Sequence, residues 1–527
     1  MYDLLIQNSM IVDGTGSPAY RADLAIANGK IAAIAPKIPA ETAREVLDAA
    51  GLVTAPGFID IHSHSDAALL LHDRCESRIY QGVTTEVSGQ CGSTIYPCPD
   101  AHLDRLQQFA GRETAAYASV SYADFLKKFE ENRKQMATNQ ISLIGHGALR
   151  CGVMGYENRK ATPEELSEMR RLLARDLEAG AWGLSLGLGY TPGVSSDREE
   201  LCSLGEIVAR HDGIVTSHMR NQGLGTPQSL DEMFEIYRSS GAHVHVSHFK
   251  ASGKAAWGHA QEYIDIVHDA QKKGIAVTAD VYPYLAASSG ITNSFPKWSI
   301  QGGKEVAVAM LKDPARRGKL MEELEKTFAA KEDGEALYVV TTNGAYPPAD
   351  GKNIWQLSRA LGCSMAEAAA RVAVETNAGA TCISFAMCES DVDLMLSQND
   401  FAIGSDGSCL PLSPDENKGK PHPRNFGTFP RFLRLCREKG LCSLEIAVHR
   451  ITGLSASIMG LTDRGVLREG LVADLTLFRA DEITDRATYE DPFQKPQGVY
   501  HVLMDGRFAL RDGLQTPLLL GKFLLKK

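Results

Sequence analysis

Six side chains suited to metal chemistry follow short apolar runs at well-separated points of this 527-residue sequence. Each run has the composition of a β-strand, so each of these residues would lie at the carboxyl end of a strand. In a (β/α)8 barrel that end carries the active site. Imidazole, thiolate and carboxylate groups gathered there predict a zinc site with an acid–base carboxylate, and hence a metal-dependent hydrolase. The six residues are His62 and His64 in GFIDIHSHSD, Cys91 in SGQCGS, His218 in VTSHMR, His248 in VSHFK and Asp406 in AIGSDG.

The histidines are individually ambiguous. His62 and His64 are two residues apart on a strand, so both point to one face, where they could hold a metal or form a hydrogen-bonded core pair. His218 and His248 each end a strand and each follow a serine. Because four further ligand types accompany the first pair, we interpret all four histidines as ligands. Side chains alternate between the two faces of a strand, and His243 and His245 have the opposite parity to His248. We therefore expect them to face the outer helices.

Cys91 and Asp406 are the two most discriminating residues. A cysteine in a glycine-flanked turn can be a small buried residue, and a carboxylate beside glycine is a common turn residue. Next to the histidines, however, a thiolate binds zinc strongly and can bridge two metals. A carboxylate at the same place can act as general base and then as general acid. We therefore expect Cys91 to be a ligand and Asp406 to transfer the proton.

The elements that must position these residues follow a repeating pattern of apolar runs and amphipathic helices. A helix beginning at Thr162 is especially clear, with Pro163 in its first turn, a capping box completed by Glu165, and Gly180 at its end. Eight runs is the number that closes a barrel, so the fold class is predicted as α/β with a TIM-type barrel. The runs are 58–61, 83–87, 141–145, 181–185, 214–217, 244–247, 275–280 and 401–404.

Both ends of the chain instead show short alternating strands with turns, including the hairpin signal Asn28-Gly29. We predict one small β-sandwich built from both termini, with residues 1–55 and 465–527 on either side of a barrel over 56–464. The barrel pattern breaks between about residues 288 and 363, in a stretch too long for an ordinary loop. That stretch is predicted to be a subdomain inserted over the barrel mouth.

The composition limits the classes of partner. Hydrophobic residues make up 44% and charged residues 23%, as in an ordinary globular protein, and the net charge is -10. This charge argues against a nucleic-acid partner or an anionic membrane. No apolar run reaches the roughly 18 residues that a membrane helix needs, and no secretion signal is visible. Eleven cysteines without paired spacing indicate a cytoplasmic protein. The expected partner is a small-molecule substrate; no oligomeric state is indicated.

The joint set of motifs resembles the amidohydrolase superfamily, and within it the D-aminoacylase (N-acyl-D-amino-acid deacylase) family. The similar segments run through nearly the whole chain, which makes the match specific where a single segment would not be. They include PGFIDIHSHSD, QGVTTEVSGQCG, LIGHGALR, LSLGLGYTPG, TSHMRNQG, VSHFKASG, DVYPYLAASS, GSDG and HPRNFGTFPRFL.

The resemblance implies zinc-dependent hydrolysis of N-acyl-D-amino acids and a role for each site residue. Cys91, His218 and His248 would hold one tightly bound zinc. A second, weaker zinc site would comprise His62, His64, Cys91 and Asp406, with Asp406 as the general base and then the general acid. The substrate carboxylate or scissile carbonyl would contact Tyr190, Lys250, Tyr282 and Ser288. From the residues alone, Lys250 is expected near the metal, although a solvated charge would also explain it.

The sequence departs from the superfamily pattern at one point, and several alternative functions stay open. Cyclic-amide hydrolases of the superfamily carry a carboxylated lysine after strand four, whereas AWGLSLGLG has none, and Cys91 supplies the bridging-type ligand instead. A cyclic amidase, a D-residue-specific dipeptidase or an inactive amidohydrolase-like scaffold are the alternative functions. Lys297 and Arg220 would suit an acidic substrate side chain, but we interpret both as surface charges.

Overall fold

The barrel is a ring of parallel strands whose carboxyl ends meet at one mouth. The computed structural model describes residues 1–110, 114–132, 134–417 and 419–527. Hydrogen bonds join its barrel strands in two series, β6-β7-β8 and β9-β10-β11-β12-β13-β18. The parallel bridge between Ser63 and Gly407 closes the ring, and β8 and β9 are consecutive parts of one run. The eight predicted runs and the fold class are confirmed. The strands are β6 (Phe58–Asp60), β7 (Val83–Ser88), β8 (Asn139–Ser142), β9 (Ile144–Gly145), β10 (Gly183–Gly187), β11 (Ile214–His218), β12 (His243–Val246), β13 (Val277–Val281) and β18 (Phe401–Ile403).

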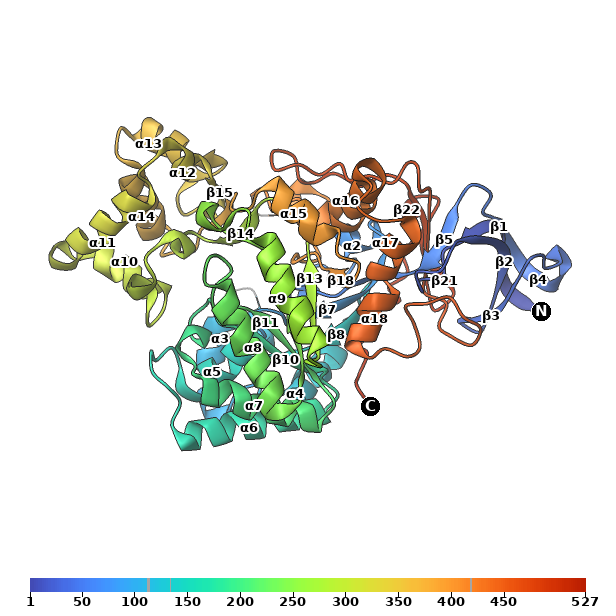
Figure 1. The fold of residues 1–527 in the computed structure, drawn as a ribbon, viewed down its shortest axis with the longest axis horizontal. Coiled ribbons are helices and arrows are strands. Elements are labelled where there is room, and N and C mark those ends of the chain that lie inside the picture. The colour runs from blue at the N-terminus through green and yellow to red at the C-terminus, as the bar shows by residue number, and fades with distance from the viewer. Residues whose placement is uncertain (111–113, 133, 418) are drawn as a thin grey trace.

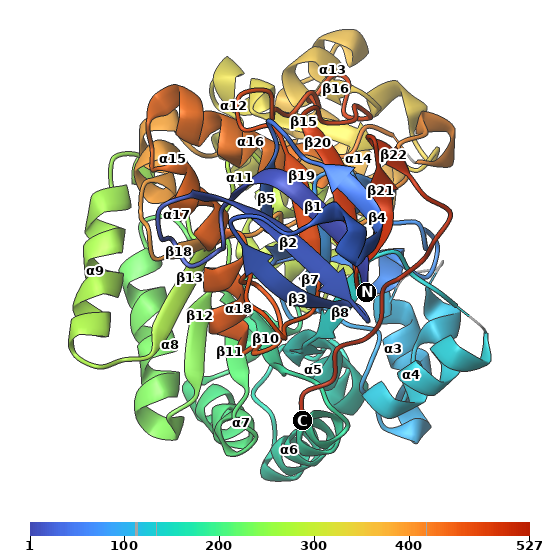
Figure 2. The same cartoon turned by 90° about the vertical axis from the view of Figure 1, so that its right-hand side faces the viewer.

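Helices cover the outside of this ring (Figures 1 and 2). The helix predicted after Thr162 is present, with both hydrogen bonds of its capping box, and its residues Met169, Leu173 and Leu177 are buried against the barrel. The covering helices are α1 (Ser65–Ala68), α2 (Glu76–Ile79), α3 (Leu103–Ala110), α4 (Tyr122–Glu131), α5 (His146–Met154), α6 (Pro163–Glu178), α7 (Arg198–Arg210), α8 (Thr226–Ser240), α9 (Ala260–Lys272), α15 (Glu389–Leu396), α16 (Arg424–Lys439), α17 (Leu444–Arg450) and α18 (Gly453–Met459).

Strands from both chain termini form one nine-stranded sheet beside the barrel (Figure 2). The two halves join where β5 pairs antiparallel with β19. Asn28 and Gly29 both have positive φ, 52° and 75°, as the tight turn between β2 and β3 requires. The sheet comprises β1 (Tyr2–Ile11), β2 (Tyr20–Ala27), β3 (Lys30–Ala35), β4 (Ala43–Asp48), β5 (Val53–Pro56), β19 (Leu475–Phe478), β20 (Val499–Met504), β21 (Arg507–Arg511) and β22 (Leu514–Gln515).

A subdomain with its own apolar core lies between β13 and β18 and extends away from the barrel at the end opposite the terminal sheet (Figure 1). It reaches beyond the predicted residue 363, because its sheet continues to β17. Its elements are β14 (Ala287–Gly290), α10 (Lys304–Lys312), α11 (Pro314–Thr327), α12 (Lys331–Glu335), β15 (Leu337–Thr341), β16 (Lys352–Asn353), α13 (Ile354–Leu361), α14 (Met365–Glu375) and β17 (Thr381–Ser384).

The last residues of the chain return to the barrel. The Gly521 N–H donates to the Met136 carbonyl at 2.8 Å, and the Lys526 N–H donates to the Gly180 carbonyl at 2.9 Å. The domain boundaries given above stay a prediction. Within the described ranges, none of the helices is long and apolar enough to cross a membrane.

Candidate active site

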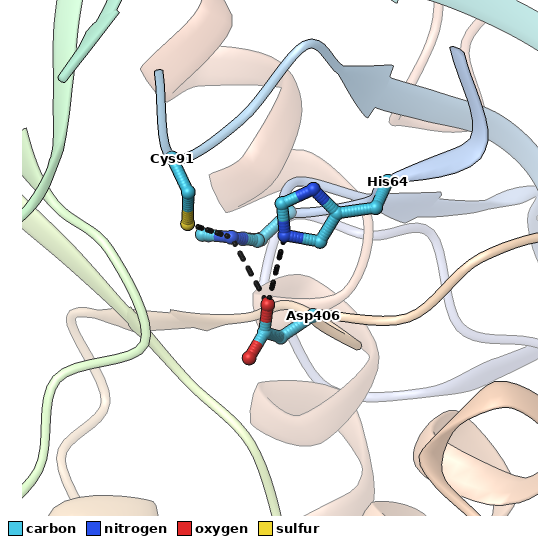
Figure 3. Close-up of side chains that lie close together, drawn as sticks. His64, Cys91 and Asp406 are labelled. Atoms are coloured by element: carbon cyan, nitrogen blue, oxygen red, sulfur yellow. Dashed lines mark hydrogen bonds and ion pairs between the residues drawn. The ribbon is translucent and has the colours of Figure 1, made fainter. Parts of the chain in front are cut away.

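Six predicted residues meet at the barrel mouth in two overlapping groups. His62, His64, Cys91 and Asp406 form one group, and Cys91, His218 and His248 form the other. Within each group the candidate ligand atoms all lie within 4.8 Å of one another. Figure 3 shows the side chains of Cys91, His64 and Asp406 turned toward a common centre. Cys91 belongs to both groups, which is the arrangement expected of a ligand that bridges two metals.

The donor set of the second group fits zinc. Cys91 Sγ lies 3.4 Å from His248 Nε2 and 3.8 Å from His218 Nδ1, and these two nitrogens are 2.9 Å apart. Burial lowers the pKa of His218, and it lowers that of His248 to about 4, so both imidazoles are neutral. Burial alone would raise the pKa of Cys91, but the neighbouring His62 and the hydrogen bonds of the sulfur with His218 and His248 hold it well below its usual value. Neutral imidazoles and a thiolate are the forms that bind zinc.

Three of these residues sit in an uncommon backbone conformation. Cys91, His248 and Asp406 have φ of 54°, 38° and 52°, in the left-handed region. Such conformations cost free energy for residues other than glycine and are concentrated at functional sites. The Cys91 turn also requires glycine at position 187, because a Cβ on Gly187 would lie 2.1 Å from the Cys91 carbonyl oxygen. In these left-handed turns the three side chains converge at the strand ends.

Both oxygens of Asp406 have close partners. Its Oδ1 lies 3.1 Å from His64 Nε2, and Arg424 Nη1 donates to its Oδ2 at 2.7 Å. Burial opposes ionisation, but the Arg424 guanidinium and the surrounding histidines hold the pKa of Asp406 well below its usual value. The carboxylate is therefore ionised and able to accept a proton. Arg424 had no assigned role in the sequence, although it lies in the motif HPRNFG.

Asp280 is a second residue that the sequence did not reveal, and it supports ligands from both groups. Its Oδ2 lies 3.2 Å from His62 Nδ1 and 3.0 Å from His245 Nε2, and its Oδ1 accepts from the His248 backbone N–H at 3.0 Å. A carboxylate behind a metal-binding histidine sets the tautomer and orientation of the ring. Asp280 is completely buried and thus has the position of such a support.

The prediction that His243 and His245 face the outer helices is wrong. Val244 and Val246 belong to the apolar core outside the barrel, so their neighbours in β12 point inward. His245 is 1% exposed and contacts Asp280, while His243 Nε2 lies 2.9 Å from Thr278 Oγ1. The error arose because His248 lies beyond the strand, in a turn with positive φ, where the alternation of side chains no longer holds.

The site opens into a cavity of about 1060 Å³ between the barrel mouth and the inserted subdomain. Tyr190, Lys250 and Ser288 line it, as expected for substrate-binding residues. Tyr282 does not line this cavity; the centre of its ring lies 4.9 Å from Lys250 Nζ, and its hydroxyl has no hydrogen-bond partner among the described residues. The ring of Tyr190 is 4.3 Å from that of His218.

The cavity is rich in positive charge although the protein as a whole is acidic. Lys250 is 7% exposed and forms no ion pair with any described carboxylate within 4 Å. Arg424, Lys297 and Arg220 line the same space. Arg220 is committed to structure, because it pairs with Glu232 at 3.0 Å and donates to the Val194 carbonyl at 2.7 Å. Arg424 pairs with Asp406, so Lys250 and Lys297 are the cations that favour an anionic ligand.

Comparison with known proteins is consistent with this geometry. A model of the amidohydrolase family matches residues 45–509. An N-acyl-D-aspartate deacylase of Alcaligenes xylosoxydans xylosoxydans is 33% identical over 98% of this chain and 93% of its own. The structure of an N-acyl-D-glutamate deacylase from Bordetella bronchiseptica, with zinc and a phosphonate that mimics the tetrahedral intermediate, superposes with a TM-score of 0.83 at 30% identity, covering 99% of each chain. A D-aminoacylase, described as activated by one metal and attenuated by a second, gives the same score and identity over 100% of each chain.

Proposed function

The chain belongs to the amidohydrolase family, and from this we propose that it hydrolyses the amide bond of N-acyl-D-amino acids to a carboxylate and a free D-amino acid. The observation that carries the proposal is that two ligand groups share Cys91. These groups lie beside the ionised Asp406, at the base of a cationic cavity. Three relatives are named as enzymes that act on N-acyl-D-amino acids, and each is similar to this chain over nearly its full length.

We assign zinc to the site as its metal. Cys91, His218 and His248 would hold the tightly bound ion, and His62 and His64 would complete a weaker second site with Cys91 and Asp406. The D-aminoacylase that is activated by one metal and attenuated by a second supports this division. The chemistry that zinc supplies when bound is Lewis-acid activation of the attacking water and of the scissile carbonyl.

The protein's own groups move the proton and hold the substrate. Asp406 accepts the proton of the attacking water and then donates it to the departing nitrogen, so its ionised state is the one that starts the reaction. Tyr190, beside His218, is assigned to the oxyanion that develops on the carbonyl. Lys250 and Arg424 supply the positive charge that an α-carboxylate needs. Ser288, on the inserted subdomain, is assigned to the same carboxylate.

A substrate panel tests the activity directly. The zinc-loaded protein should release amino acid from N-acetyl-D-leucine, N-acetyl-D-aspartate or N-acetyl-D-glutamate, and much more slowly from the L forms. The acidic members also test Lys297, which lines the cavity and would suit a side-chain carboxylate. Hydrolysis confined to hydantoins or to dipeptides would favour the cyclic amidase or the dipeptidase. A purified protein with no bound zinc and no amide hydrolysis at all would favour the scaffold.

Replacing Lys250 with methionine should lower kcat/KM ten- to a hundredfold and leave the zinc content unchanged. The reason is the loss of a hydrogen bond to a charged group, worth about 1.5–3 kcal/mol. An α-amidated substrate lacks the anionic partner, so mutant and wild type should hydrolyse it about equally. Lys304→Met, at the exposed rim of the same cavity, is the matched control. An equal loss on both substrates would rule out the carboxylate contact.

Asp280→Asn should weaken metal binding on the order of 10–100-fold, as found for carboxylates that support metal-binding histidines. Asparagine keeps the shape of the side chain but has one acceptor oxygen where three donors converge. Competition with a chelator measures the change independently of activity. Thr278→Val, which removes only the hydroxyl beside His245, should change the affinity little. Unchanged zinc affinity in Asp280→Asn would show that Asp280 only fills space.

We place the enzyme in the cytoplasm, acting on a small molecule without nucleic acid or membrane. The support is that all eleven cysteines are unpaired, as is usual in a reducing compartment.

A further inference from the structure

Two thiols face each other at the outer end of α16. Cys436 lies in the last turn of the helix, and its Sγ is 3.5 Å from the Sγ of Cys442. The chain reverses between them at Gly440, which has φ of 66° and donates its N–H to the Cys436 carbonyl at 3.0 Å. The helix end thus brings together two cysteines that are six residues apart in the sequence. Neither of them lines the active-site cavity.

A buried guanidinium accompanies the pair. Arg450 is completely buried, and its Nε donates to the Phe401 carbonyl at 2.7 Å. Its Nη2 has no hydrogen-bond partner of standard geometry among the described residues. The hydrogen bond from Cys436, together with the charge of Arg450, lowers the pKa of Cys442 to about 7 against the cost of burial. The same thiol contact, with burial, raises the pKa of Cys436.

The two thiols therefore differ in the way that a nucleophilic and a resolving cysteine differ. Cys442 is half-buried and within reach of small solutes, whereas Cys436 is 4% exposed. Another close pair, Cys75 and Cys409, is fully buried, and the pKa of Cys409 is raised. A low-pKa thiol that is accessible and next to a second thiol is the arrangement found at oxidation-sensitive sites.

We propose that Cys442 is a reactive thiol which hydrogen peroxide oxidises, and that Cys436 resolves the product to a reversible disulfide. The Cys442 thiolate attacks one oxygen of the peroxide, the O–O bond breaks, and a sulfenic acid forms as hydroxide leaves. The Cys436 sulfur then attacks the Cys442 sulfur, the S–O bond breaks, and the S–S bond forms. The proton of the Cys436 thiol leaves with the oxygen as water. The two thiols lose two electrons in total, and the peroxide is reduced to two molecules of water.

Peptide mapping of the zinc-loaded, full-length protein tests this site. Brief treatment with hydrogen peroxide, followed by alkylation, should give a linked Cys436–Cys442 peptide that has lost two hydrogens and that dithiothreitol restores. Cys442→Ser should abolish the linkage and leave Cys436 unoxidised. Cys436→Ser should trap Cys442 as a sulfenic acid that dimedone labels. Cys202→Ser, at another half-buried cysteine, should behave as wild type.

Alkylation rates of the wild-type protein provide a test that does not depend on any variant folding. At pH 7 about half of Cys442 would be thiolate, against about 3% for a thiol of pKa about 8.5; allowing for its lower intrinsic nucleophilicity, Cys442 should react roughly threefold faster. Cys202 and Cys363 are the internal references, since both are half-buried and burial raises the pKa of each. The proposal is overturned if Cys442 reacts no faster than they do, or if peroxide oxidises Cys202 without linking Cys436 to Cys442.

Discussion

Replacing Asp406 with asparagine should lower kcat on the order of 10²- to 10⁴-fold, the usual contribution of a general acid–base group, while the tightly bound zinc remains. The loss follows because an amide cannot accept the proton of the attacking water. The zinc should stay because Cys91, His218 and His248 form a ligand group that does not include Asp406. The fold should persist, since the asparagine oxygen can still accept from Arg424. Steady-state kinetics, zinc content and thermal unfolding measure the three outcomes separately.

The matched control for this change is Glu305→Gln. Glu305 lines the same cavity, is exposed, and undergoes the same loss of a carboxylate. Its kcat should stay close to wild type, which would show that the effect belongs to Asp406 and not to the charge of the cavity. If Asp406→Asn kept kcat within a fewfold of wild type, the assignment of the proton transfer would be wrong.

The barrel could be predicted from the sequence because local pattern and chemistry coincide. Each apolar run is buried on both faces in a parallel sheet, which makes it stand out from the amphipathic helices. Ligand-type residues follow five of the runs, and the connectivity of a barrel brings all their carboxyl ends to one mouth. The terminal sheet was predictable for a similar reason, since β5 and β19 lie at opposite ends of the chain and neither can bury its apolar side chains alone.

The supporting residues could not be predicted, because their roles depend on contacts between distant segments. Asp280 acts on His62 across 218 residues, and nothing in the spacing of either motif indicates that pairing. Arg424 reaches Asp406 across 18 residues, from the first residue of α16. For His245 the alternation rule failed, since the strand ends at Val246 and His248 has left-handed backbone. Local rules hold within an element and fail at the turn where the active site begins.

Replacing Cys91 with alanine should remove both metals and almost all activity. Cys91 belongs to both ligand groups, so its loss leaves only His218 and His248 for the tight site. The fall in zinc affinity should exceed the 10–100-fold expected for a residue that merely supports a ligand. His64→Ala should behave differently, because His64 belongs only to the group assigned to the weaker metal. That variant should keep one tightly bound zinc, measured by elemental analysis after dialysis.

Loss of a buried thiol could also lower activity by destabilising the fold, and Cys382→Ala separates this effect from loss of a ligand. Cys382 is fully buried in the apolar core of the inserted subdomain. Its replacement should lower the melting temperature modestly and leave the zinc content unchanged. Cys91→Ala should instead lose zinc and change the melting temperature of the metal-free protein little, because alanine keeps the same backbone conformation and only the metal-binding thiolate is lost. Stoichiometric tight zinc and normal turnover in Cys91→Ala would exclude Cys91 from the metal centre and with it the bridged arrangement.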